Sequence, residues 1–136
     1  MATPKSQRAE SQLTVIEQSR ELAEYTIKIC SNEKVFPKRY RWCLTSKLVD
    51  SAIEVCSKTK MANSVFVKDR ADYTLRKGYQ TEAIAHASSL LSMIEVSASV
   101  FGIDMDRVRY WTKLVVSVKN SLQNWRESDA RRYDNK

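Results

Sequence analysis

The chain has 136 residues, a formal net charge of +7, two glycines and two prolines. This length fits a single domain, residues 1–136, that can bury a core without disulfide or metal staples. So few glycines and prolines leave almost no material for hairpins and tight turns, which argues against an all-β domain and predicts an all-α one.

The first twelve residues are polar and show no signal-peptide pattern. No apolar run approaches the roughly 20 residues that span a bilayer, so we expect a cytoplasmic protein without a membrane partner. Cys30, Cys43 and Cys56 have apolar neighbours and no metal-ligand spacing. We expect them to be reduced, mostly buried thiols that serve packing.

A first helix is predicted from about Ser11 to Asn32, after a polar tail at residues 1–10. Its main apolar stripe, interrupted by Arg20, comprises Leu13, Ile16, Ala23, Ile27 and Cys30. A second stripe on another side comprises Val15, Leu22 and Ile29.

A second helix is predicted from Pro37, which suits a first helical position, to about Lys60. Its main stripe comprises Tyr40, Leu44, Leu48, Ala52 and Val55, and a neighbouring strip comprises Trp42, Val49, Ile53 and Cys56. The surplus apolar residues on the first two helices form either a subunit interface or simply the wide core-facing stripes that small bundles have.

A third helix should begin between Ser64 and Ala71 and end at Phe101, with Gly78 weakening its early part and Gly102 as a left-handed cap. A fourth, from Met105 to about Arg131, follows the N-cap Asp104. Its seam has a period of about 3.5 residues and comprises Val108, Trp111, Val115, Val118, Leu122 and Trp125. Long helices with short connections predict an antiparallel up-down four-helix bundle, with a second polar tail at about 127–136.

The sequence lacks the residue patterns of the common catalytic and metal sites. His86 is the one histidine, and Ala83 stands where a Glu-x-x-His metal pair would need a glutamate. Phosphate-binding glycine loops and nucleophile triads are also missing. Asp69 and Asp72 are better explained as helix-start charges. We therefore expect no enzyme, no metal and no cofactor.

Positive charge is concentrated in the middle of the chain. Residues 34–77 carry eleven Lys/Arg and four Asp/Glu, a net of +7, whereas the preceding segment carries −1 and the following one +1. Cations in a helix's first turn cost roughly 0.3 to 1 kcal/mol each unless an anion compensates. The candidate nucleic-acid-binding residues are Lys38, Arg39, Arg41, Lys47, Lys58, Lys60, Lys68, Arg70, Arg76 and Lys77.

Two aromatic residues, Tyr40 and Trp42, lie between these cations. They could stack on the bases of single-stranded nucleic acid. Alternatively they continue the two apolar strips of the second helix and belong to the core.

The run FPKRYRWCLTSKLVDSAIEV, the later YQTEAIAHASSLLSMIEVSASVFGID and the final VRYWTKLVVSVKNSLQNW resemble a bacterial four-helix-bundle family over about residues 13–126. That family contains the accessory variability determinant (Avd) proteins of diversity-generating retroelements and proteins encoded in ribosomal RNA intervening sequences. Its more specific marks here are Phe36 to Arg41 and Leu122-x-x-Trp125.

For the Avd proteins, the resemblance implies a basic homopentamer that binds RNA or RNA/DNA and the retroelement's reverse transcriptase, and so supports mutagenic copying without a catalytic group of its own. It carries binding over to Lys38, Arg39 and Arg41. The alternative is an adaptor encoded in a ribosomal RNA intervening sequence, binding an acidic protein partner or RNA.

Overall fold

The computed structural model describes residues 5–134. Within that range the chain forms four α-helices and no strand: α1 (Lys5–Cys30), α2 (Ser46–Ser64), α3 (Arg70–Phe101) and α4 (Met105–Tyr133). Two short helical turns precede α2, the 3₁₀ turn η1 (Lys38–Tyr40) and the π turn η2 (Arg41–Thr45). The predicted all-α class is confirmed.

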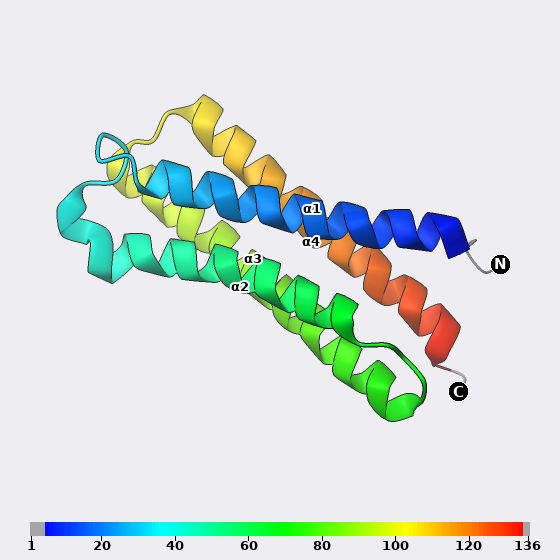
Figure 1. The fold of residues 1–136 in the computed structure, drawn as a ribbon. Helices are drawn as coiled ribbons and strands as arrows, with labels where there is room; N and C mark the ends of the chain where they lie inside the picture. The colour runs from blue at the N-terminus through cyan, green and yellow to red at the C-terminus, as the bar shows by residue number, and fades with distance from the viewer. Residues whose placement is uncertain (1–4, 135–136) are drawn as a thin grey trace.

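The four helices pack side by side along most of their lengths (Figure 1). Contacts join α1 to α2, α2 to α3, α3 to α4 and α4 back to α1, so each helix has two neighbours around one core. The described beginning of α1 and the end of α4 lie on the same side in Figure 1, which is consistent with the expected up-down order.

The side of α1 that faces the core differs from the predicted main stripe. Val15, Leu22 and Ile29, from the predicted second stripe, are buried, whereas Leu13 and Ile27 are 56% and 42% exposed. The second stripe therefore lies fully in the core, whereas the expected main stripe is divided: Ala23 and Cys30 are buried, and Leu13 and Ile27 face solvent.

Polar residues complete this buried side of α1, which explains the error. Ser19 donates from its Oγ to the carbonyl of Ile16 at 2.8 Å, and Thr26 Oγ1 accepts a 3.0 Å hydrogen bond from the indole nitrogen of Trp111. Both side chains are buried with their hydrogen bonds made, so they occupy core positions that hydrophobic periodicity does not detect.

On α4 the predicted seam is confirmed from Trp111 to Trp125, and Val108 packs at its edge. The predicted polar tails are wrong where the structure describes them. Residues 5–10 belong to α1, and α4 continues to Tyr133 because Asp129 and Tyr133 are themselves buried. Residues 1–4 and 135–136 lie outside the described residues.

Side-chain caps define the start of α3. Asp69 Oδ1 accepts from the backbone N–H of Asp72 at 2.9 Å, and Asp72 Oδ2 accepts from that of Lys68 at 3.0 Å. The first bond satisfies a backbone donor that the helix leaves free, and the second ties Lys68, which precedes the N-cap, to the first turn of α3. The interpretation of both aspartates as helix-start charges is confirmed. At the other end Gly102 is left-handed, with φ 59°, as predicted.

Helix α3 corrects the expectation that no apolar run approaches membrane-spanning length. An 18-residue stretch of it has a mean hydropathy of 1.4, and 22% of that stretch is buried in the bundle. By length and composition alone α3 could cross a membrane, because its Lys and Arg residues lie before Gly78. Core helices of bundles have the same composition, so the cytoplasmic location stays a prediction.

The three cysteines have different environments rather than a common one. Cys30 is buried, Cys56 is partly buried and Cys43 is exposed. Burial raises the pKa of Cys30 to about 12, which keeps its thiol protonated and unreactive at neutral pH. The packing role predicted for all three therefore fits Cys30, and does not fit Cys43.

Replacing Gly78 by alanine should stabilise the protein. Gly78 lies inside α3 with no positive φ, and a Cβ built there meets no heavy atom within 4 Å. The alanine should therefore add about 1 kcal/mol of unfolding free energy through helix propensity. Urea unfolding followed by circular dichroism measures the change, and an unaltered or lower midpoint would contradict it.

Candidate nucleic-acid interface

Phe36 anchors the chain between α1 and η1. It is buried, its ring centroid lies 5.5 Å from that of Phe101 and 6.0 Å from that of Trp111, and its backbone N–H donates to the carbonyl of Asn32 at 2.9 Å. Edge-to-face aromatic contacts of this kind fix both position and orientation. The segment that follows is therefore held against the end of the bundle where α3 meets α4.

The predicted start of the second helix at Pro37 is wrong in detail, because residues 38–45 form η1 and η2 and α2 itself begins at Ser46. Lys38, Arg39 and Arg41 thus precede the amino end of α2 instead of lying in its first turn. Single π turns within helical segments are rare and frequently occur at functional sites.

Tyr40 lies just before the π turn and Trp42 lies within it, and their side chains have different environments. Tyr40 is half-buried with its ring 5.0 Å from that of Phe101, whereas Trp42 is 83% exposed. At this turn, the carbonyl of Tyr40 accepts hydrogen bonds from Cys43 Sγ at 3.6 Å and from Thr45 Oγ1 at 3.5 Å. Tyr40 therefore packs at the edge of the bundle against Phe101, and the core explanation is wrong for Trp42.

Four of the predicted cations, Lys38, Arg39, Arg41 and Lys47, form what we call the first basic group. All four side chains are exposed. None makes an ion pair with a carboxylate among residues 12–134, although Arg39 lies over the Tyr40 ring at 5.1 Å. Their positive charge is therefore not neutralised within this part of the chain.

A hollow of about 310 Å³ adjoins the first basic group where the end of α1 meets the start of α2. Its lining comprises Cys30, Ser31, Arg41, Thr45, Ser46, Val49 and Asp50. Arg41 contributes a cation to this lining, Asp50 a carboxylate and Val49 an apolar side chain.

A second basic group lies around the connection between α2 and α3 and comprises Lys60, Lys68, Arg70 and Lys77, all exposed. Arg70 Nη1 donates to the backbone carbonyl of Asp134 at 3.2 Å. In Figure 1 this connection and η1–η2 lie at opposite ends of the molecule. The predicted cations therefore do not form one continuous patch.

Lys58 differs from both groups. Its Nζ lies 3.2 Å from Glu82 Oε2 on α3, and the side chain is only 23% exposed. Because a carboxylate already neutralises this charge, Lys58 contributes less to anion binding than the unpaired lysines do.

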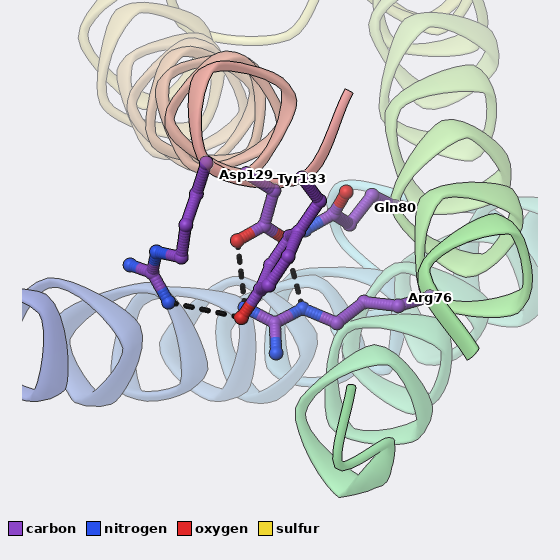
Figure 2. A network of polar contacts seen from close by, with 5 residues as sticks. Arg76, Gln80, Asp129 and Tyr133 are labelled. Atoms are coloured by element: carbon purple, nitrogen blue, oxygen red, sulfur yellow. Dashed lines mark hydrogen bonds and ion pairs between the residues drawn. The ribbon is translucent and has the colours of Figure 1, made fainter. Parts of the chain in front are cut away.

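Arg76 is the clearest correction to the predicted site. It is buried, and its Nε and Nη2 each donate at 2.8 Å to the two carboxylate oxygens of Asp129 (Figure 2). Its guanidinium also lies over the Trp125 ring at 5.0 Å. Sequence position alone gave no sign of this pairing, since Asp129 is 53 residues away in the chain. Arg76 is not available to nucleic acid.

The same carboxylate also accepts a hydrogen bond from Gln80, whose Nε2 lies 2.8 Å from Asp129 Oδ2. Figure 2 shows Arg76 and Gln80 reaching from α3 toward α4, with Tyr133 beside them. A buried charge needs this degree of hydrogen bonding to offset its lost hydration. The network therefore ties the early half of α3 to the last turns of α4.

Sequence reasoning did not select the cations at the start of α4. Arg107 and Arg109 are exposed and lie at the same end as the first basic group, because Phe101, just before α4, contacts both Phe36 and Tyr40. Arg109 Nη1 is 3.6 Å from Asp106 Oδ1, which neutralises part of this charge. The sequence signal for this location is the short connection at Gly102, which places the start of α4 at the same end of the bundle as the end of α3.

Residues 12–134 contain no cluster of three side chains suited to hold a metal ion. His86 lies 3.9 Å from Glu54 on the neighbouring α2, a contact between two partly exposed side chains. Comparisons with family models, with curated proteins and with solved structures found no match to the chain.

Changing Asp129 to asparagine should destabilise the fold by about 3 to 5 kcal/mol, because Arg76 would remain buried without a counter-charge. Urea unfolding at fixed protein concentration measures the loss. The matched control is the double variant Arg76→Met with Asp129→Leu, which removes both charges and should recover most of it. A single variant that unfolds at the same urea concentration as the parent would contradict this assignment.

Proposed function

We propose that the chain is a non-catalytic accessory protein of a diversity-generating retroelement, which binds template RNA or cDNA and the reverse transcriptase through its basic surface. The first basic group is the observation that carries the binding half of this proposal. Four exposed cations without carboxylate partners in the described chain favour a polyanion, since each phosphate they contact releases condensed counterions.

The part of the proposal that concerns a retroelement and its polymerase rests on a resemblance to the family of Avd proteins. The resemblance covers about residues 13–126 and is most specific at Phe36 to Arg41. In this role the protein would supply no reacting group. It would hold RNA and polymerase together by phosphate contacts, which position a nucleic acid without reading its sequence. Two basic groups at opposite ends of the bundle suit such bridging, because one long strand or two partners can engage both.

Charge reversal at Lys38, Arg39 and Arg41 should weaken RNA binding strongly. Removing about three phosphate contacts should also reduce the slope of log affinity against log salt by about 2 for a single strand. Fluorescence anisotropy with a labelled RNA at several salt concentrations measures both quantities.

The matched control reverses three other exposed cations, Lys28, Lys113 and Arg131, and so makes the same change in net charge. It should bind RNA with nearly the parental affinity. Equal affinities for the two triple variants would refute a localised site. An acidic protein partner that binds the basic face without competing with RNA would instead favour the adaptor alternative.

We further propose that copies of the chain associate, as the resemblance to a pentameric family implies, and that the surplus apolar residues on the outer sides of α1 and α2 form the contact. Leu13 and Ile27 on α1 and Ile53 on α2 are 56%, 42% and 43% exposed, and the two helices pack against each other. These exposed aliphatic side chains on two neighbouring helices support the proposed contact, because association would remove them from water.

Changing Ile53 to glutamate should disrupt this association without unfolding the chain, because the position already meets solvent. Sedimentation velocity at one protein concentration should then show a smaller species than the parent. Val96→Glu serves as the control, since Val96 is similarly exposed on α3 and lies outside the proposed interface. Identical sedimentation of parent and Ile53 variant would rule this interface out.

A further inference from the structure

Trp42 has an unusual environment for the largest apolar side chain. It is 83% exposed, whereas Trp111 and Trp125 are 0% and 6% exposed. Within residues 12–134 the indole has no ring–ring contact and no cation over its face. Leaving so much apolar area in water costs free energy that a stacked ligand would recover.

The position of Trp42 is set by a held backbone. The two residues before it include Tyr40, whose ring packs on Phe101, and the carbonyl of Trp42 accepts a 3.3 Å hydrogen bond from Ser46 Oγ. The π turn therefore presents the indole from a supported segment. A ligand that stacks on it would not have to order a loose loop, which lowers the entropic cost of binding.

Charge decides what kind of ligand fits. Trp42 directly follows Arg41, and Lys38, Arg39 and Lys47 lie within five residues of it in the chain. None of these cations is paired with a carboxylate among residues 12–134. A purely apolar partner would leave them unneutralised. A ligand with a flat aromatic face and nearby negative charge satisfies both features, and a nucleotide has both.

We infer that Trp42 is a stacking platform for an unpaired base, with the first basic group binding the adjacent phosphates. The surface therefore prefers single-stranded over double-stranded nucleic acid, because duplex bases are already stacked on each other and offer no free face. This inference rests on the proposed nucleic-acid binding and adds the form of nucleic acid that is bound.

The test compares Trp42→Ala with Trp42→Phe, using a single-stranded RNA of mixed sequence and a duplex of the same length. The alanine variant should lose about 5-fold to 100-fold in affinity for the single strand and little for the duplex, as base–aromatic stacking predicts. The phenylalanine variant keeps a ring and should stay within about 3-fold of the parent on the single strand. Circular dichroism confirms that both variants fold.

Acrylamide quenching gives a second readout, because Trp42 is the exposed tryptophan among the three. Saturating single-stranded RNA should protect the quenchable fraction, and duplex should protect it less. The inference is overturned if Trp42→Ala loses equal affinity for both nucleic acids or loses affinity for neither. It is also overturned if Trp42→Ala changes only the sedimentation of the protein, because that result would show a protein contact at Trp42. If the charge-reversed triple variant loses RNA while Trp42→Ala does not, stacking fails and the proposed function stands.

Discussion

The packing of Phe36 and Tyr40 against Phe101 is the constraint on which the candidate interface depends. These contacts join the segment before α2 to the connection between α3 and α4, which lies more than 60 residues further along the chain. With two aromatic rings held inward, the intervening cations are left facing solvent. The π turn then carries Trp42 outward as well. An arrangement that buries hydrophobic area thus also exposes the charged and aromatic groups available for binding.

Arg41 and Arg76 show how one residue type serves two purposes in this bundle. Arg76 has a carboxylate opposite it on α4, so its charge is neutralised inside and helps to define which helix faces meet. Arg41 has no such partner among the described residues, so its charge stays exposed and unpaired there. Counting all basic residues therefore overestimates the positive charge that a surface can offer to a ligand. Only the exposed cations without a carboxylate partner should be counted.

Three features meet near the junction of α1 and α2: unpaired cations, an exposed indole and a hollow that reaches Cys30 on α1. The same two helices carry the exposed aliphatic residues at which we propose a contact between copies. Assembly through that side would repeat the basic end once per subunit and multiply its contacts with a long strand. Repeated weak phosphate contacts of this kind raise the overall affinity through effective concentration.

Composition and periodicity alone determined the all-α class, the range of residues in which α3 starts, its cap at Gly102, and the seam from Trp111 to Trp125, because these depend on local propensity and on helical repeat. The concentration of charge in residues 34–77 was equally visible. Tertiary packing decided the rest. It placed Val15, Leu22 and Ile29 in the core and left Leu13 and Ile27 of the apparent main stripe exposed, because Ser19 and Thr26 satisfy their hydroxyls inside the core. Tertiary packing also buried Arg76, because its ion-pair partner Asp129 is distant in sequence. It left Trp42 exposed, because the π turn that contains Trp42 is a backbone geometry that no periodic pattern encodes.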